Sequence, residues 1–177
     1  ILKLGEKASV QFNWTKVKGI GEYDATKNYI FEFDTKITDK GDGSVWGGSG
    51  NTRALYVAFG GWYNLLEIND TNGQVKIGSS TKNFADADYL NKSVHVTISW
   101  SGDTISTSVT DASGNVLISG SRTSSSFTDM TAEQAAMTYL VLRCEDGAAE
   151  IDNFTFKTKT SEAISTTALN IADGKQA

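Results

Sequence analysis

Alternation of polar and apolar residues with a period of two is the feature of this sequence that most constrains its fold. It is clearest between residues 28 and 38, where Tyr29 and Phe31 occupy one set of alternate positions and Glu32 and Asp34 the other. Successive side chains of a β-strand point to opposite faces, so the pattern predicts a strand with one buried face. The same period recurs in residues 8–17, 94–100 and 149–157. The sequence therefore predicts sheets with one apolar and one polar face.

Turn signals separate these segments. The chain contains 17 glycines and no proline, so its turns depend on residues that adopt positive φ, such as those in Asn-Gly, Asp-Gly and Ser-Gly pairs. About ten short strands, with a turn every eight to twelve residues, predict an all-β protein folded as a two-sheet antiparallel β-sandwich. We expect one short helix between residues 130 and 137, and a serine-rich loop at residues 121–126.

The length of 177 residues allows one domain with a substantial core. Because the alternation ends near residue 157, residues 1–157 are predicted to form a single sandwich domain. Residues 158–177 are rich in Thr, Ser and Ala and are expected to be a linker or a loosely attached tail. We expect no membrane insertion, since no apolar run approaches the ~20 residues that span a bilayer. The first residues do not form a signal peptide, and we expect the chain to be a fragment of a larger protein.

The charge and the cysteine content exclude several classes of function. A formal net charge of −5 argues against a nucleic-acid partner, because phosphate binding requires a basic face. Cys144 is the only cysteine, which excludes an intrachain disulfide and a cysteine-based metal cluster. Its apolar sequence neighbours predict a buried, unreactive thiol. His95 is the only histidine, so a histidine-rich zinc site is excluded as well.

Aromatic residues in turns are the first candidates for a binding site. Trp46, Trp62 and Tyr63 lie in or beside glycine-rich turns, whereas Trp14 and Trp100 continue apolar strand faces and are expected in the core. Exposed aromatic rings commonly mark a binding site, and the flat C–H face of a pyranose ring stacks on such rings. Two interpretations stay open at this point, because Trp62 at the end of the sandwich could instead cap its core.

Polar residues beside these rings and on the outward strand faces complete the predicted carbohydrate site. The predicted members are Arg53, Glu67, Tyr56, His95 and Arg143, with Asn51 and Asn64 as further polar neighbours. The parity of their strands assigns Tyr56 and His95 to outward faces, and on the strand of Arg143 either Arg143 or the alternate residues point outward. A face that carries tyrosine, arginine, histidine and carboxylates suits a polysaccharide groove. The alternative is an ordinary solvated surface.

Three segments resemble members of the concanavalin-like and jelly-roll superfamily. They are residues 29–37, residues 94–100 with the Ser-Gly-Asp turn that follows, and residues 140–156. The resemblance implies a jelly-roll or concanavalin-like sandwich that serves as a non-catalytic carbohydrate-binding module of a secreted bacterial polysaccharidase. We expect a plant polysaccharide as ligand, with a hemicellulose such as xylan ahead of β-glucan or starch. We also expect a monomeric module, secreted or attached to the cell surface, with a catalytic domain covalently attached in the parent protein.

The last strand of such sandwiches often holds an aspartate that binds a structural calcium ion or ties the last strand to the first. Residues 149–156 resemble that strand, and Asp152 is the corresponding carboxylate. The resemblance thus implies a calcium site in which Asp24 or Glu22 joins Asp152, since carboxylates suit this hard cation. Asp and Asn are unfavourable in strand interiors, so the Asp152-Asn153 pair is expected to have a local role.

Two other classes of function compete with the binding module. Glu32, Asp34 and Lys36 resemble the Glu-x-Asp-x-(x)-Glu strand of laminarinase-type glycoside hydrolases, which implies an atypical hydrolase. In that scheme two carboxylates act as nucleophile and general acid, and Lys36 in the third place can do neither. We expect Glu32 and Lys36 to neutralise one another on a wet surface. The other competitor is a cell-surface adhesion or structural domain whose aromatic residues are buried.

Overall fold

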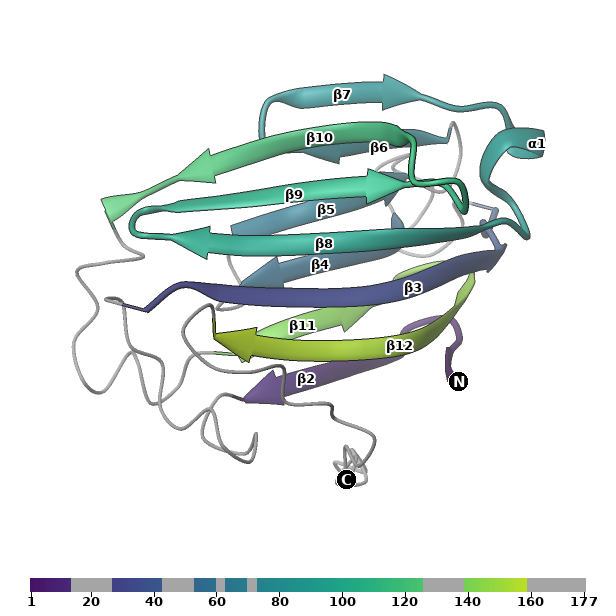
Figure 1. The fold of residues 1–177 in the computed structure, drawn as a ribbon. Helices are drawn as coiled ribbons and strands as arrows, with labels where there is room; N and C mark the ends of the chain where they lie inside the picture. Colours follow the sequence, from purple (N-terminus) through teal and green to yellow (C-terminus); the bar gives the residue numbers. More distant parts are fainter. Residues whose placement is uncertain (14–26, 43–52, 60–62, 70–72, 126–138, 159–177) are drawn as a thin grey trace.

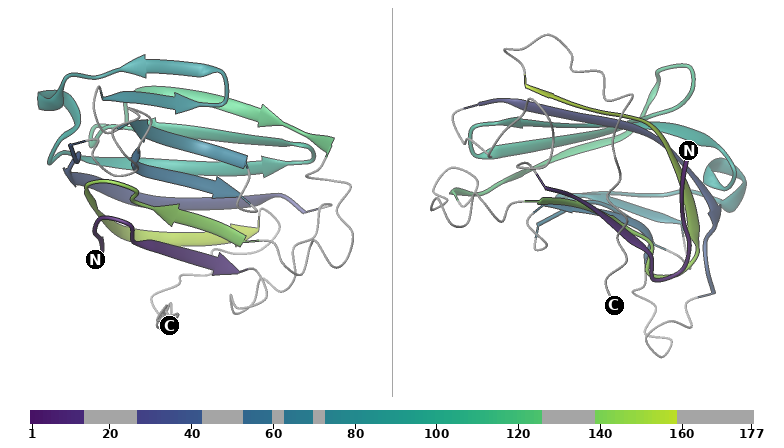
Figure 2. Two further views of the ribbon diagram at one scale, coloured as in Figure 1. Left: turned by 180° about the vertical axis from the view of Figure 1, so that it is seen from behind. Right: turned by 90° about the horizontal axis from the view of Figure 1, so that it is seen from below.

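The computed structural model describes residues 1–13, 27–42, 53–59, 63–69, 73–125 and 139–158. Over these residues the chain forms two antiparallel sheets of six strands each (Figure 1). The sheets pack face to face, as the right-hand view of Figure 2 shows. The predicted two-sheet β-sandwich is confirmed.

Sheet A contains the first and the last strand of the described residues. Its order is β1 (Leu2–Leu4), β12 (Ala148–Thr158), β3 (Tyr29–Asp39), β8 (Ser93–Ser101), β9 (Thr104–Thr110) and β10 (Val116–Thr123). The register sets Leu2 opposite Ile151, so the first strand pairs with the last. It also sets Asp34 in the centre of the sheet, opposite Asp152 on one side and His95 on the other.

Sheet B forms the second layer. Its order is β2 (Ser9–Asn13), β11 (Tyr139–Arg143), β4 (Arg53–Phe59), β5 (Tyr63–Asn69), β6 (Gln74–Ile77) and β7 (Ser80–Asn83). The predicted hairpin of residues 52–59 and 62–69 is confirmed by the pairing of β4 with β5. The turn that joins these two strands lies outside the described residues.

The core lies between the sheets and follows the predicted alternation. On β3, Tyr29, Phe31, Phe33 and Ile37 are at most 3% exposed, and Thr35 on the same inward face is 1% exposed. The alternate residues of β3 point to the outer face. Each such burial stabilises the fold by about 1.5–3 kcal/mol. Trp100, 1% exposed, lies in this core as predicted, whereas Trp14 lies outside the described residues.

The predicted buried thiol of Cys144 is confirmed. Its side chain is fully buried beside the apolar core. Burial disfavours the thiolate and raises the pKa of Cys144 to about 12. At neutral pH the group is therefore a protonated, unreactive thiol.

The sheets meet closely where the turn between β6 and β7 touches the edge strand β10. Gly78 has a φ of +57°, and a Cβ there would lie 2.2 Å from the carbonyl oxygen of Ser121. A Cβ on Gly120 would lie 2.4 Å from the carbonyl oxygen of Ile77. Glycine is therefore required at both positions for backbone to contact backbone. The contact covers β10, which would otherwise be an open edge.

Several local predictions differ from the structure. The loop expected at residues 121–126 is wrong for residues 121–123, where β10 continues opposite residues 104–106 of β9. Cross-strand pairing there outweighs the weak strand preference of serine. The short strands β1 and β7 were not predicted, and residues 84–92 contain a single helical turn, α1 (Asp86–Tyr89). The helix predicted at residues 130–137 lies outside the described residues.

The predicted domain division stays a prediction. Strand β12 ends at Thr158, and the rest of the predicted tail lies outside the described residues. No helix in the described part of the chain is long and apolar enough to cross a membrane.

Candidate functional site

One row of side chains crosses sheet B on the face that points away from the core. Arg143 of β11 lies opposite Tyr56 of β4, Tyr56 opposite Glu67 of β5, and Glu67 opposite Lys76 of β6. Residues directly opposite one another on antiparallel strands share a face. Lys76 is exposed and the other three are half-buried. These four residues are the cross-strand row, and they place three of the predicted binding residues side by side.

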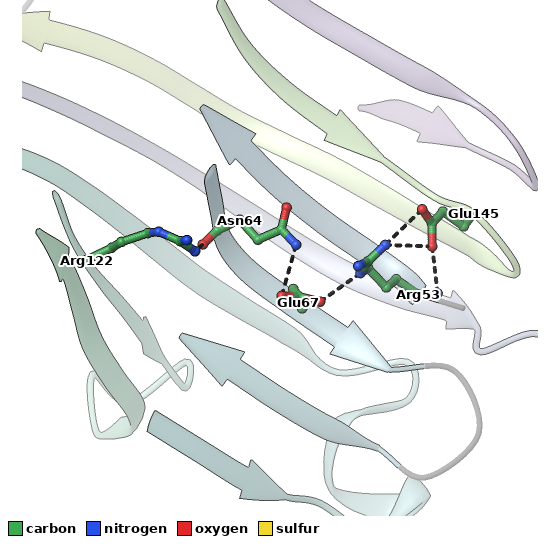
Figure 3. Close-up of polar contacts among 5 residues, drawn as sticks. All are labelled: Arg53, Asn64, Glu67, Arg122 and Glu145. Carbon is green, nitrogen blue, oxygen red and sulfur yellow. Dashed lines mark hydrogen bonds and ion pairs between the residues drawn. The ribbon is translucent and has the colours of Figure 1, made fainter. Parts of the chain in front are cut away.

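Arg53, at the start of β4, is held between two carboxylates beside this row (Figure 3). Its Nε donates to Oε2 of Glu67 at 2.7 Å, and its Nη1 donates to Oε1 and Oε2 of Glu145 at 3.0 and 3.1 Å. The backbone N–H of Arg53 also donates to Oε2 of Glu145 at 3.2 Å. In return, the carbonyl of Arg53 accepts hydrogen bonds from the N–H groups of Glu145 and Asp146. The guanidinium of Arg53 is thus held by two carboxylates, and its backbone is held by hydrogen bonds to residues 145 and 146.

Asn64 completes this group through a bulge in β5. The pairing of β4 with β5 shifts by one residue after Val57, which leaves Leu65 as an extra residue on β5. The shift lets Nδ2 of Asn64 donate to Oε1 of Glu67 at 3.0 Å. Figure 3 also shows Arg122 of β10, whose Nη1 makes a long hydrogen bond of 3.5 Å to the backbone carbonyl of Asn64. Arg53, Asn64, Glu67 and Glu145 are named the Arg53 network.

The charges of the Arg53 network stabilise one another. Burial alone would raise the pKa of Glu67, but the hydrogen bonds from Arg53 and Asn64 and the attraction of Arg53 outweigh it and lower that pKa. Burial would likewise lower the pKa of Arg53, yet Glu67 and Glu145 raise it. Side-chain exposures of 29% for Arg53, 25% for Glu67 and 12% for Glu145 leave part of the network in reach of solvent. Arg53 and Glu67 are both charged at neutral pH.

Tyr56 packs against this network. The central guanidinium carbon of Arg53 lies 5.1 Å from the centroid of the Tyr56 ring, within the range of a cation–π contact. A half-buried ring is thereby fixed beside an amide, two carboxylates and a guanidinium. Such a surface can hydrogen-bond a polyhydroxyl or charged ligand while the ring covers an apolar face of it.

Sheet A carries a second polar cluster on its own outer face. Nδ1 of His95 lies 2.8 Å from Oδ1 of Asp34, and Nδ2 of Asn153 donates to Oδ2 of Asp34 at 2.6 Å. Nζ of Lys157 donates to Oε2 of Glu32 at 2.9 Å. Burial would raise the pKa of Glu32, but Lys157, with His95, lowers it instead. These five residues are named the sheet A cluster.

The expected pairing of Glu32 with Lys36 is wrong. Glu32 pairs with Lys157, and Lys36 pairs with Glu150 at 2.6 Å. Residues four apart on a strand are separated by about 13 Å along it, whereas a residue on the neighbouring strand is about 5 Å away. Cross-strand partners therefore outcompete partners on the same strand.

The expected local role of the Asp152-Asn153 pair is confirmed. The pairing of β12 with β3 shifts between Asp152 and Thr155, and Asn153 has a φ of 49°. At this bulge Oδ1 of Asp152 accepts the backbone N–H of Asn153 at 3.0 Å, while the Asn153 side chain reaches Asp34. Asn tolerates the left-handed conformation that the bulge requires.

The calcium site stays a prediction. Asp152 is exposed, and its proposed partners Asp24 and Glu22 lie outside the described residues. Within the described part of the chain, no group of three or more His, Cys, Asp and Glu is placed to hold a metal ion.

The structure separates the predicted binding residues into two faces. Arg53, Tyr56, Glu67 and Arg143 belong to sheet B, whereas His95 lies on the outer face of sheet A. Trp46 and Trp62 lie outside the described residues, and for Tyr63 only the strand pairing opposite Phe59 is described. Glu145 was missed, because it follows a different strand and lies 92 residues from Arg53 along the chain.

A shallow hollow of about 440 Å³ lies over strands β8, β9 and β10 of sheet A. Hydroxyl groups line most of it, and its lining residues include Thr97, Ser99, Ser106, Ser108, Ser119 and Ser121. Ser79 of the turn between β6 and β7 and Ser80, the first residue of β7, complete it. No aromatic ring belongs to this lining, in contrast to the face that carries Tyr56.

Comparisons with known proteins identify the fold. No protein-family model matches the sequence, and no curated protein matches it. Among solved structures, lectin I-B4 of Griffonia simplicifolia in its metal-free form is 10% identical, with a TM-score of 0.51 over 86% of this chain and 81% of the lectin. Winged bean acidic lectin in complex with methyl-α-D-galactose is 10% identical, with a TM-score of 0.50 over 84% of this chain and 75% of that one.

An enzyme also occurs among the similar structures. Alginate lyase AlyC3 is 13% identical, with a TM-score of 0.47 over 89% of this chain and 74% of the lyase. At these identities the likeness concerns the fold alone. The chain shares a two-sheet sandwich fold with the two lectins, and its chemistry has to be argued from its own residues.

Proposed function

We propose that this chain binds a polysaccharide without chemically altering it, through the outer face of sheet B. The observation that carries the proposal is the Arg53 network beside the ring of Tyr56. Sugar hydroxyls both donate and accept hydrogen bonds, so a fixed set of carboxylates, amide and guanidinium offers partners of both kinds. Because the network is already ordered by its own contacts, little side-chain entropy is lost when the ligand binds.

The proposal also covers where the module acts and what it is attached to. A sandwich fold shared with two lectins is compatible with sugar binding, although a fold alone does not assign a function. We place the module outside the cell or on its surface, as a monomer joined to a polysaccharidase that performs the chemistry. The ranking of xylan above β-glucan and starch stays a prediction.

The non-catalytic part of the proposal is supported by the state of Glu32. A glycosidase general acid requires a carboxyl group whose pKa is raised, so that it is protonated near neutral pH. Lys157 and His95 lower the pKa of Glu32, and Lys36 is engaged with Glu150. Release of reducing sugar that disappears in Glu32→Gln would replace this proposal with the hydrolase alternative.

Affinity electrophoresis against a panel of plant polysaccharides tests the binding site. We expect at least one polysaccharide to retard the protein, and we expect Tyr56→Ala and Glu67→Gln to remove the retardation. His95→Ala is the matched control, since it truncates a partly exposed ring on the opposite sheet. If no polysaccharide retards the protein, the proposal fails. If His95→Ala removes retardation while Tyr56→Ala does not, the site belongs to sheet A.

A further inference from the structure

The cations of the cross-strand row differ from most others in the described residues. The described lysines and arginines are mostly engaged by carboxylates, backbone carbonyls or rings, as Lys36, Arg53 and Lys157 illustrate. Within the described part of the chain, only Lys76, Lys92 and Arg143 have side chains that form neither an ion pair nor a hydrogen bond, and Lys76 is attracted more loosely by Glu67 opposite it. Two of these three, Arg143 and Lys76, occupy the two ends of the cross-strand row.

The spacing of these two cations suits an extended ligand. Arg143 lies on β11 and Lys76 on β6, with β4 and β5 between them. Neighbouring strands are about 4.8 Å apart, so the two Cα atoms are separated by about 14 Å. Tyr56 and Glu67 fill the interval. An oligosaccharide of a few rings that crosses the strands spans this distance.

The charges of Arg143 and Lys76, at the two ends of the cross-strand row, indicate which ligand group binds there. A guanidinium without a partner presents a planar fork that matches a carboxylate in a bidentate contact. Lys76 adds a second positive charge and Arg53 a third. These three positive charges exceed the two negative charges of Glu67 and Glu145. The site is thus locally cationic on a chain whose formal net charge is −5. Opposing charges more than about 8 Å away are largely screened at physiological ionic strength, so the local balance dominates.

Resting on the proposed function, we propose that the polysaccharide is acidic and carries uronate carboxylates. One carboxylate binds Arg143, another binds Lys76, and a sugar ring between them covers Tyr56. Glu67 and Glu145 accept hydrogen bonds from the ring hydroxyls. A nucleic acid does not fit this arrangement, since two isolated cations neutralise few phosphates and the carboxylates between them repel the rest.

Pairs of polysaccharides that differ in charge test this inference by isothermal titration calorimetry with the full chain. Polygalacturonate and its methyl ester share a main chain and differ in carboxylate charge. Glucuronoxylan and arabinoxylan share a xylan main chain, and only the former carries uronate branches. We expect the acidic member to bind more tightly in at least one pair, with an affinity that falls as the salt concentration rises. The pair that responds tells whether the uronates belong to the main chain or to branches.

Charge-removing variants locate the contact. Arg143→Gln and Lys76→Gln keep hydrogen-bonding capacity and are each expected to lower the affinity for the preferred acidic polysaccharide roughly tenfold. Lys92→Gln is the matched control, because Lys92 is an exposed and equally unpaired lysine outside the row. Arg143→Lys is expected to recover part of the loss.

The outcomes separate the two proposals. Equal affinities within both pairs, or unchanged affinity in Arg143→Gln and Lys76→Gln, overturn the acidic ligand. If a neutral polysaccharide still binds and Tyr56→Ala still removes that binding, the proposed function survives this result. If none of the four polysaccharides binds and the electrophoresis panel is also negative, both proposals fail.

Discussion

The outer faces of the two sheets share one structural feature, a β-bulge. On each sheet a β-bulge shifts the register by one position and brings an asparagine amide to a carboxylate of a central strand. On sheet B, Asn64 donates to Glu67 at 3.0 Å. On sheet A, Asn153 donates to Asp34 at 2.6 Å. Bulges redirect side chains in this way and are frequent next to functional sites.

The two faces differ in what surrounds that carboxylate. On sheet A the neighbouring polar and charged groups satisfy one another, since Asp34 contacts the His95 ring, and Glu32 contacts Lys157. On sheet B the Arg53 network ends against the ring of Tyr56, and the side chains of Arg143 and Lys76 in the same row form no ion pair or hydrogen bond. A face whose charges are already paired has little left to offer a ligand. The difference favours sheet B as the binding face.

Removal of Arg53 is expected to have the largest effect of the variants that compare the two faces. Arg53→Ala leaves Glu145, 12% exposed, and Glu67, 25% exposed, without their cation. We expect a loss of about 2–3 kcal/mol in the free energy of unfolding, because breaking a mostly buried pair strands a charge. Equilibrium unfolding in urea measures it.

Lys157→Ala on sheet A is the matched variant. Lys157 is 30% exposed and Glu32 25% exposed, and only one ion pair joins them. We expect a loss below about 1 kcal/mol. Equal losses in the two variants would remove the energetic distinction between the faces and leave only the geometric one.

The bulge of sheet A is expected to be the next most sensitive feature. Asn153→Ala removes the hydrogen bond to Asp34 and places a Cβ-bearing residue without a polar side chain at a φ of 49°. A loss of about 1–2 kcal/mol follows from the left-handed conformation and the broken hydrogen bond. Thermal unfolding checks it, with Asn153→Gly separating the two causes, since glycine accepts this φ. A larger loss in Asn153→Gly than in Asn153→Ala would contradict the conformational argument.

The direction of side chains on each strand could be predicted from the sequence. Alternation assigned Glu32, Asp34 and Tyr56 to outward faces, and the structure places them there. That information is local, because the two faces of a strand are decided by parity. It was sufficient for the fold class and for most of the strands.

The partners of those side chains could not be predicted, because they depend on strand order. Lys157 lies 125 residues from Glu32, and Glu145 lies 92 residues from Arg53. Nothing in the alternation tells which sheet a strand joins, so His95 was grouped with Tyr56 although they lie on different sheets. The Asp152-Asn153 pair was the exception, since two poor strand formers in one strand predicted a local irregularity.

A substitution on the inward face of β3 is expected to stabilise the fold, by a smaller amount, and tests the contrast between inner and outer faces. Thr35 is 1% exposed on the same strand as Glu32 and Asp34, and its hydroxyl forms no hydrogen bond. Thr35→Val keeps the shape of the side chain and removes a buried polar group, so we expect a gain of about 1 kcal/mol. Urea unfolding measures it, with the half-buried Thr97→Val on the outer face of β8 as the control without gain. A loss in Thr35→Val would show that the hydroxyl is satisfied in solution.

The smallest effect concerns acid sensitivity. The pKa of Glu67 lies below its ordinary value of 4.5 in the folded chain, so the ionised form is favoured by folding. Its contribution is fully present above about pH 4.5 and is lost as the pH falls through the lowered pKa. The destabilisation caused by Glu67→Gln is therefore expected to be larger at about pH 7 than at about pH 3, by less than about 1 kcal/mol.

Glu32→Gln provides the same measurement on sheet A, where Lys157 and His95 also lower the carboxyl pKa. Both variants are expected to flatten the acid limb of the curve of unfolding free energy against pH. The two faces are thus alike in acid response and differ in ligand response, because only Glu67 lies in the proposed binding site. A polysaccharide that binds at neutral pH should stabilise Glu32→Gln as much as the unaltered chain, and Glu67→Gln less. Equal stabilisation of both variants would place the ligand away from the cross-strand row.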